Sequence, residues 1–306
     1  MKIKLIATNL IYSECYMHLK QDTMNLTDTK KTIELLENIN SSDDYAYERA
    51  VLAYLKLGGL PVFTNDLSSG LSFFHTRTHE SEDFFFKISD ISIPPQKFVK
   101  DFARCNRPFQ SVFYCSETRP TSYMELLENW VDSKKIGEIL KITLGLWEFK
   151  KSIKTIIVTT PDPENRISSF DKEHGTAFDS LIMKNSGEEL EAQKLFYRFL
   201  FEKFRKPAKK DLKTYIITSS YCNVALMHTN GQADGIYFPS VPFKENGINL
   251  CINRDFFNAE NIELKTAIRY EFSITENEQK KHYFREIGKI ESREIRLQED
   301  LLIWNK

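Results

Sequence analysis

The sequence predicts an α+β fold with a mixed or antiparallel β core. Segments rich in β-branched and aromatic residues, such as 138–149 and 153–159, have the composition of strands. Amphipathic helical segments lie before and between the strands, but the two types do not alternate in the regular βαβ order of a doubly wound sheet. The chain has 306 residues, of which 41% are hydrophobic, so it can bury a sizeable core.

The first part of the chain, residues 1–68, is predicted to be a helical N-terminal extension. Ile33, Leu36 and Ile39 recur at helical spacing, and a second apolar helical segment follows before a pair of glycines. Neither segment carries an evident group of chemically reactive side chains. Packing or partner binding is therefore the expected role of this extension.

The main domain is predicted to span residues 69–255. It begins with strands and includes a strand at 111–115 followed by a helix at 121–131, with Thr121 as the predicted N-cap. A helical insertion is predicted at about 160–210, because the apolar residues of SGEELEAQKLFYRFLFEKFRK recur at helical spacing. Residues 256–306 are charged and rich in β-formers, and we expect them to form a β-rich tail packed on the main domain.

The charge balance gives no reason to expect binding to nucleic acid or to a membrane. Forty-two Lys and Arg residues face forty-three Asp and Glu residues, which leaves a formal net charge of -1. Non-specific binding to anionic polymers or surfaces needs an excess of positive charge. No apolar stretch approaches the ~20 residues of a membrane span, and the start of the sequence lacks the pattern of a signal peptide.

The cysteines favour a reducing compartment, and the cytoplasm is the expected location. They are odd in number and form no C-x-x-C pair, so neither a disulfide framework nor a zinc knuckle is predicted. Their positions are Cys15, Cys105, Cys115, Cys222 and Cys251.

Four short pieces carry polar residues in segments that otherwise look structural. They are Arg77 in FFHTRTH; Arg104, Asn106 and Tyr114 in ARCNRPFQSVFY; Glu125 in TSYMELLENW; and Ser240 in DGIYFPS. Each piece alone has an ordinary explanation: an arginine in a strand as an ion-pair partner, a glutamate near a helix start as a dipole partner, and a serine between prolines as turn chemistry.

Taken in order, the four pieces resemble the RES domain family, which is named for its arginine, glutamate and serine. The three name-giving residues match Arg77, Glu125 and Ser240. Further matches are Arg104, Asn106 and Pro108 in the family's GRxNxP element, Tyr114 in the following strand, and Gly247, Asn249 and Leu250 in the closing G-x-N-L element. The resemblance covers about residues 70–255.

The chain departs from the family pattern at several points. Ala103 replaces the first glycine of the GRxNxP element. About a hundred residues separate Glu125 from Ser240, which is where the helical insertion is predicted. The N-terminal extension and the C-terminal tail are additions to the compact toxins of the family.

The resemblance implies a fold like that of the ADP-ribosyltransferases and NAD+ as the substrate. Family members degrade NAD+ with phosphate or water as the acceptor, or transfer ADP-ribose to a target. Many are the toxin of a toxin–antitoxin pair, which a small helical antitoxin neutralises by covering the active cleft. Three functions therefore stay open: NAD+ cleavage, ADP-ribosylation of a protein target, and a catalytically silent module that binds a partner.

The chemistry of NAD+ cleavage suits the matched residue types. Loss of nicotinamide leaves an oxocarbenium-like ribose, which a carboxylate such as Glu125 can stabilise. An arginine suits the pyrophosphate, with Arg77 as first choice and Arg104 as second. Tyr114 can stack on the cationic nicotinamide ring, and Ser240 can align the ribose by a hydrogen bond. The resemblance adds Asn106 to the NAD+-binding set.

No metal or nucleotide cofactor beyond NAD+ is expected. His75 and His79 have the spacing of a helical metal site, but they lie in a strand-like segment. No glycine-rich element opens a helix after a strand, which argues against a Rossmann or P-loop site.

Overall fold

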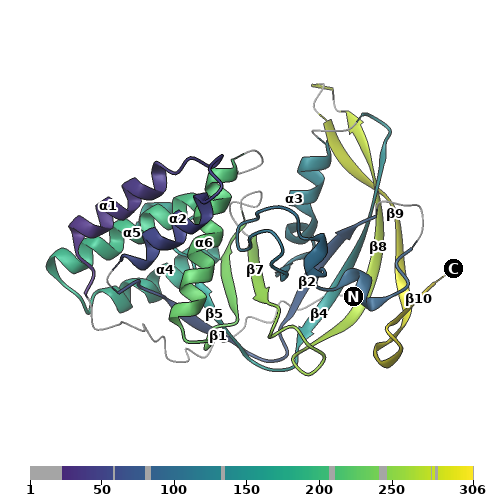
Figure 1. Ribbon diagram of the computed structural model, residues 1–306. Coiled ribbons are helices and arrows are strands. Elements are labelled where there is room, and N and C mark those ends of the chain that lie inside the picture. Colours follow the sequence, from purple (N-terminus) through teal and green to yellow (C-terminus); the bar gives the residue numbers. More distant parts are fainter. Residues whose placement is uncertain are drawn as a thin grey trace.

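A single mixed sheet organises the part of the chain that the structure describes (Figure 1). The computed structural model describes residues 23–57, 59–79, 84–131, 135–206, 211–240, 247–276, 278–279 and 282–305, without the side chains of residues 125, 128–131 and 282. Within these ranges the sheet has ten strands in the order β1-β5-β6-β7-β3-β2-β4-β8-β9-β10. They are β1 (Thr64–Leu67), β2 (Ser72–Thr78), β3 (Val112–Ser116), β4 (Ile139–Phe149), β5 (Ile153–Ile157), β6 (Gly235–Pro239), β7 (Ile248–Asn253), β8 (Ile262–Glu276), β9 (His282–Arg296) and β10 (Leu301–Trp304).

The α+β prediction is confirmed at the level of fold class. Neighbouring strands are antiparallel except for β5 and β6, which run parallel. Six α-helices accompany the sheet in the described residues: α1 (Leu26–Glu37), α2 (Ala46–Leu55), α3 (Arg119–Val131), α4 (Ser169–Ile182), α5 (Gly187–Arg205) and α6 (Leu212–His228). Four short 3₁₀ turns are η1 (Ile88–Ile91), η2 (Gln96–Phe98), η3 (Pro163–Asn165) and η4 (Leu297–Glu299).

Local sequence explains where several helices begin. The Asn25 side chain accepts a hydrogen bond from Asp28 N–H at the start of α1. Ser168 and Asp171 form a reciprocal capping box at the start of α4. Helix α3 begins at Arg119, two residues before the predicted start, and its first turn is tied by Thr118, whose hydroxyl accepts from Thr121 N–H at 3.3 Å. Thr121 is therefore inside the helix rather than its N-cap.

The helices fall into two groups around the sheet. Five of the six described helices gather at the β1–β5–β6 end, whereas α3 lies apart from them beside β8 and β9 (Figure 1). Phe204 of α5 packs on Phe238 of β6, and Phe170 of α4 packs on Tyr237, the neighbouring residue of the same strand. Because neighbouring strand residues point to opposite faces, α4 and α5 cover opposite faces of β6.

The N-terminal residues are part of the main core. Tyr54 of α2 is buried against Tyr221 of α6 and donates to the Ile217 carbonyl at 3.1 Å. Strand β1 pairs with β5, so the range predicted as helical also contributes a strand. Its sequence, TNDL, has no strand pattern of its own, and pairing with β5 determines its conformation.

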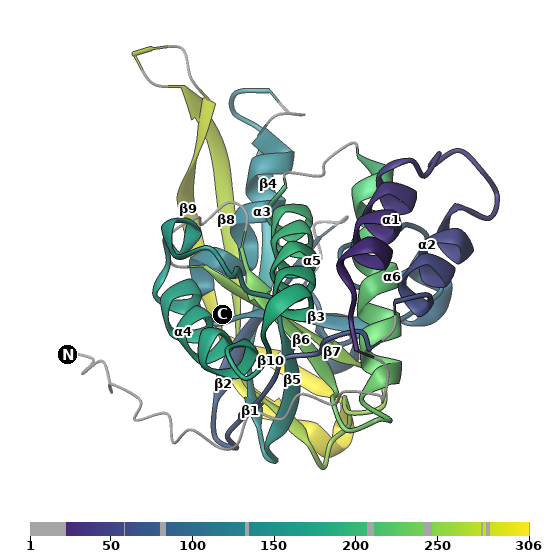
Figure 2. The ribbon, with the colours of Figure 1, turned by 90° about the vertical axis from the view of Figure 1, so that its left-hand side faces the viewer.

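The C-terminal residues form the strands β8, β9 and β10. Strands β8 and β9 make a long ribbon that projects from the body (Figure 2). After the β9–β10 turn the chain returns to the sheet, where Leu302 N–H donates to the Phe86 carbonyl at 2.7 Å and Trp304 Nε1 donates to the Phe85 carbonyl at 2.8 Å. The tail is thus anchored on the segment that follows β2.

A glycine in β6 allows the strand that leads to Ser240 to approach β7 closely. Replacing Gly235 by Ala is expected to lower the free energy of unfolding by about 1–3 kcal/mol. A Cβ there would lie 2.9 Å from the Cys251 carbonyl oxygen, which the ladder holds in place. Urea unfolding checks this, with Gly288→Ala as the matched control. A Cβ at Gly288 first meets the movable Glu271 carboxylate, at 3.3 Å. Equal stability of the two variants would contradict the close approach.

Candidate active site

One face of the sheet carries most of the predicted site residues, and we call it the α3 face. Thr76 of β2 and Ser122 of α3 are hydrogen-bonded through their hydroxyls at 2.5 Å, which shows which face α3 covers. Cross-strand partners point to the same face of a sheet. Phe74 is two residues before Thr76 on β2 and therefore points to the same face. The cross-strand pairs that continue from it are Phe74 with Ser116, Ser116 with Asn249, and Asn249 with Phe238, so these residues also lie on the α3 face.

Two predicted residues, Tyr114 and Asn106, meet at the Tyr114 hydroxyl. Tyr114 lies on β3, two residues before Ser116, and so belongs to the α3 face. Its hydroxyl donates to Asn106 Oδ1 at 2.9 Å and accepts from the backbone N–H of Cys105 at 2.9 Å. Asn106 Nδ2 in turn donates to the Arg107 carbonyl at 3.1 Å. Burial raises the Tyr114 pKa well above its ordinary value, so the phenol stays protonated and can donate.

Arg104 connects this loop to the helical insertion. Its two terminal nitrogens donate to the carbonyls of Lys203 at 3.2 Å and Lys206 at 2.8 Å, at the C-terminal end of α5. The guanidinium is 9% exposed and lies 6.0 Å from the Tyr215 ring centre. A buried cation is favourable at a helix C-terminus, where carbonyl groups point outward without helical partners.

Ser240 lies on the same face with a buried and unpartnered hydroxyl. The β6–β7 ladder extends to Ser240, whose N–H donates to the Gly247 carbonyl at 2.7 Å. Two residues after Phe238, Ser240 continues the α3 face. The residue is 1% exposed, and its Oγ has no hydrogen-bond partner among the described residues. Such a group costs about 1–3 kcal/mol unless a ligand or water satisfies it.

A polar pair lies beside Ser240, and sequence reasoning gave it no role. The Ser116 hydroxyl donates to Asn249 Oδ1 at 2.7 Å, and both side chains are buried. Of the two, the sequence analysis named only Asn249, as a match to the G-x-N-L element. The signal that could have singled them out is strand alternation, since Tyr114 and Ser116 are two residues apart on one strand.

Glu125 lies on α3, the helix that packs on this face. Its side chain is outside the described residues, so the structure tests only the position of its helix. Helix α3 rests on a second core cluster through Leu127 and Tyr123, which contact the β4–β8 region on the α3 face. Helix α3, which includes Glu125, therefore packs on the same sheet face as Ser240 and Tyr114.

Arg77 is not brought together with these residues by any described contact. Thr76 points to α3, so Arg77, the next residue of β2, points to the opposite face. There its guanidinium donates to the Ser92 carbonyl at 3.0 Å, while Nε is buried without a partner in the described part of the chain. Burial lowers the Arg77 pKa. We expected Arg77 and Ser240 to lie in one site, but they lie on opposite faces of the sheet, because successive residues of a strand point to opposite sides.

His75 is a buried neutral histidine on the same side as Arg77. Its Nδ1 lies 2.6 Å from the Tyr114 carbonyl oxygen, and its ring packs 4.5 Å from that of Phe113. Burial, with a smaller contribution from the Arg77 charge, lowers the His75 pKa to about 3. His79 instead contacts Thr143 through Nε2 at 2.6 Å. Across the described residues, no cluster of three or more His, Cys, Asp or Glu side chains could hold a metal ion.

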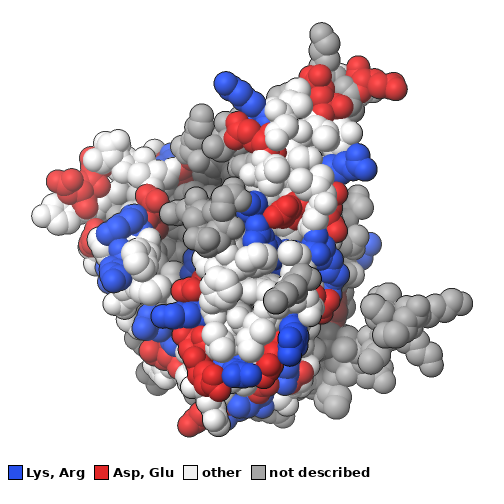
Figure 3. All heavy atoms as spheres, turned by 90° about the vertical axis from the view of Figure 1, so that its right-hand side faces the viewer, with Lys and Arg blue, Asp and Glu red and all other residues white. Residues whose placement is uncertain are grey.

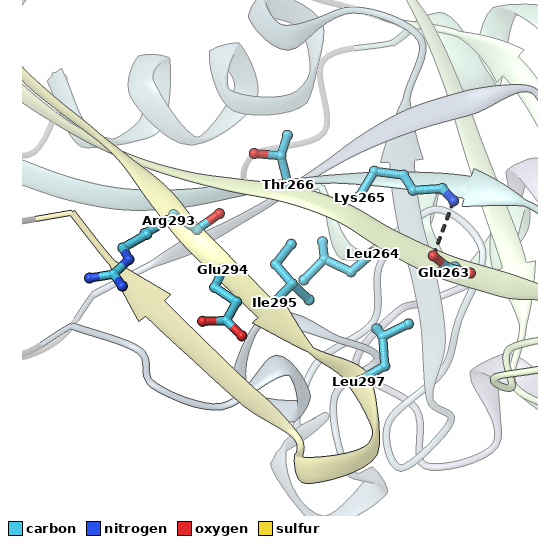
Figure 4. A pocket seen from close by; sticks show the side chains of 9 residues that line it. Glu263, Leu264, Lys265, Thr266, Arg293, Glu294, Ile295 and Leu297 are labelled. Carbon is cyan, nitrogen blue, oxygen red and sulfur yellow. Dashed lines mark hydrogen bonds and ion pairs between the residues drawn. The ribbon is translucent and has the colours of Figure 1, made fainter.

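Two hollows lie elsewhere on the described surface. Acidic and basic side chains are interspersed on the face seen in Figure 3. One hollow lies between β8 and β9, where Lys265 and Glu263 form an ion pair at 3.0 Å above Leu264 and Ile295 (Figure 4). A second hollow lies between α1 and α2. None of the helices in the described ranges has both the length and the apolar character needed to span a membrane.

Comparison with solved structures finds a weak structural likeness to a toxin–antitoxin complex. A chain in the crystal structure of the M. tuberculosis MbcT–MbcA toxin–antitoxin complex matches with a TM-score of 0.35 and 9% sequence identity, over 74% of this chain and 91% of that chain. No protein-family model and no curated protein matches the sequence. A likeness at this TM-score does not establish a shared fold, so the functional argument rests on the residues themselves.

The buried His75 predicts a loss of stability in acid. In the unfolded chain His75 has an ordinary pKa near 6.5, whereas the folded pKa is about 3. The unfolded state therefore binds a proton that the folded state rejects, and stability falls as the pH drops below 6.5. Between pH 6.5 and 4.5 this group costs roughly 2–3 kcal/mol.

The check is urea unfolding of wild type and His75→Gln at pH 7 and pH 4.5. The variant is expected to be less stable at pH 7, because it loses the histidine packing, but to lose less stability on acidification. Parallel losses in the two proteins would show that His75 does not titrate as described.

Proposed function

We propose that this protein cleaves the bond between nicotinamide and ribose in NAD+, with phosphate or water as the acceptor. The observation that carries the proposal is the buried Ser240 hydroxyl, which has no hydrogen-bond partner among the described residues and lies on the α3 face with the Ser116–Asn249 pair. Tyr114, Asn106 and Arg104 belong to the same side of the sheet. These residues support the proposal because they lie on the same side of the sheet, to which α3 adds the backbone of Glu125.

In this proposal Glu125 stabilises the oxocarbenium-like ribose that forms as nicotinamide leaves. A carboxylate close to the anomeric carbon serves this purpose while ionised, so it needs no raised pKa. The Ser240 hydroxyl gains the partner it lacks by bonding a ribose or amide oxygen of the substrate. Its backbone, fixed by the ladder to Gly247, limits how far the hydroxyl can move.

Arg104 takes over the pyrophosphate role that the sequence first favoured for Arg77. Its guanidinium lies beside the loop that contacts Tyr114, and its charge is not neutralised by a described carboxylate, since its known partners are carbonyls. Tyr114 has its hydroxyl engaged with Asn106 and Cys105, so its half-buried ring, rather than its hydroxyl, is the part offered to nicotinamide.

The finer family assignments belong to the same proposal. They are an ADP-ribosyltransferase-like core, a toxin role, and an antitoxin protein as partner. They are supported by the motif order in the sequence and by the shared location of the matched residues, and each needs its own test. Expression in a host without the antitoxin is the test of toxicity, with growth arrest as the expected result.

Nicotinamide release from NAD+ tests the activity. Wild type is expected to release nicotinamide, faster with phosphate than without it if phosphate is the acceptor. Glu125→Gln is expected to lower the rate by about 100-fold or more, and Ser240→Ala by about tenfold, because each removes a transition-state contact. Glu191→Gln on the exposed side of α5 is the matched control and should match wild type.

The outcomes separate the three functions. No release by wild type with either acceptor would favour the non-catalytic, partner-binding alternative. Transfer of label from NAD+ to protein in a lysate would favour ADP-ribosylation of a target. A near-normal rate in a folded Glu125→Gln variant would remove the carboxylate from the mechanism.

Two arginine variants test which guanidinium contacts the dinucleotide. Arg104→Lys is expected to lower kcat/KM for NAD+ by about tenfold or more, since lysine cannot reproduce a planar fork. Arg77→Lys, on the opposite face, should have the smaller effect. Urea unfolding of both variants controls for stability. A larger loss of kcat/KM in Arg77→Lys would return Arg77 to the substrate site.

A further inference from the structure

Three cysteines that are scattered in the sequence meet next to Tyr114. Cys251 on β7 is the cross-strand partner of Tyr114. Cys105 N–H donates to the Tyr114 hydroxyl at 2.9 Å. Cys222 of α6 directs its Sγ to the Arg104 carbonyl at 3.7 Å, at the peptide unit that joins Arg104 to Cys105. A loop, a helix and a strand thus each contribute one thiol to the same place.

The Cys105 thiol interacts electrostatically with both of the other thiols, Cys222 and Cys251. All three residues are between 0% and 3% exposed. All are free cysteines. The fourth described cysteine, Cys115, is adjacent to Tyr114 on β3 and points to the opposite face. Cys115 is equally buried and therefore provides a natural control.

The electrostatics distinguish Cys105 from its neighbours. Burial by itself would raise the pKa of the Cys105 thiol, but hydrogen bonds from Cys222 and Cys251 and the nearby Arg104 charge outweigh it, and the pKa is lowered to about 5. Burial raises the pKa values of Cys222 and Cys251 well above the ordinary thiol value. Cys105 is therefore the most easily deprotonated thiol of the three.

We propose that Cys105 and Cys222 are a redox modification site, which a hydroperoxide oxidises to a reversible disulfide. Cys222 is the favoured partner because its Sγ already reaches the peptide unit next to Cys105. Cys251 is less suited, because β7 is paired on both sides, with β3 and with β6, and the two ladders fix its position. Nothing in the proposed NAD+ chemistry requires this site.

The reaction balances with hydrogen peroxide as the oxidant. The Cys105 thiolate attacks one peroxide oxygen, so an S–O bond forms, the O–O bond breaks, and the leaving hydroxide takes up a proton to become water. The Cys222 thiol then attacks the Cys105 sulfur, so the S–S bond forms and the S–O bond breaks with loss of a second water. Two thiols lose two electrons in total, and the peroxide gains them.

The disulfide would disturb the site on the α3 face. A disulfide bond is about 2.05 Å long, much shorter than a hydrogen bond between two thiols, so one backbone segment must move. Cys222 is inside the packed helix α6, so the loop of Cys105 is the segment expected to shift. That loop carries Arg104 and Asn106, and the Tyr114 hydrogen bonds end on it. Loss of nicotinamide release on oxidation would follow, and this consequence alone depends on the proposed function.

The test counts thiols and measures mass, so it does not need NAD+ turnover. Full-length protein with Cys15→Ser is treated with hydrogen peroxide under native conditions, over hours because the thiols are buried. We expect the loss of about two thiols and of about 2 Da, reversed by dithiothreitol, with peptide mapping that links Cys105 to Cys222. Cys115→Ser added to this background should behave in the same way.

The cysteine variants make the assignment falsifiable. Cys105→Ser and Cys222→Ser should each abolish the 2 Da loss, whereas Cys251→Ser should keep it; circular dichroism confirms that each is folded. Unchanged thiols in the peroxide-treated parent protein would overturn the proposal, as would a linkage to Cys251 or a 2 Da loss that persists in Cys105→Ser. Nicotinamide release, measured separately, shows whether the disulfide affects activity.

Discussion

The hydrogen bonds of the Tyr114 hydroxyl are the constraint on which the candidate site depends. One phenol, kept protonated by burial, fixes the loop of residues 104–107 against β3 by donating to Asn106 and accepting from Cys105 N–H. With the loop in that position Arg104 reaches the end of α5 and Cys105 reaches the other two thiols. The position of the loop of residues 104–107 thus depends on hydrogen bonds to a single tyrosine of the same motif.

The helical insertion is coupled to this loop rather than appended to the domain. Arg104 binds the carbonyls of Lys203 and Lys206 at the C-terminal end of α5. The Lys203 ammonium also pairs with Glu37 at the end of α1, at 2.6 Å. The motif loop, the insertion and the N-terminal helices therefore meet at the end of one helix. This connection gives the added segments a means to influence the loop, which a peripheral domain would not have.

The sequence predicted which segments are helices or strands better than it predicted the side to which each strand residue points. Amphipathic periodicity correctly indicated the helices before and within the main domain, since apolar spacing reports one buried side. Helix α6 has no such periodicity, because YIITSSYCNVAL is apolar or neutral on all sides, and it packs against α2 and α5. Burial on every side removes the periodic signal that separates a helix from a strand.

In the candidate site, too, the sequence indicated which residues belong to a motif but not the side of the sheet to which they point. Motif order grouped Tyr114, Asn106 and Arg104; in the structure Tyr114 is hydrogen-bonded to Asn106, whereas Arg104 binds carbonyls at the end of α5. Motif order could not place Arg77, because whether a strand residue faces one side or the other depends on the register with the neighbouring strand and on where α3 packs. The cysteines were likewise interpreted from spacing alone. Their proximity arises from pairing between β3 and β7 and from the packing of α6, which are contacts distant in sequence.

Ser240 shows why stability alone does not explain this arrangement. A buried hydroxyl without a partner is destabilising, and alanine at the same position would bury no unsatisfied group. The neighbouring serine, Ser116, has its partner in Asn249, so the β6–β7–β3 region can satisfy a hydroxyl where the fold requires it. Local rules of this kind are broken mainly where a ligand completes the missing contact. The two serines lie on one face and differ in one respect: Ser116 has a partner in Asn249, whereas Ser240 Oγ has none among the described residues.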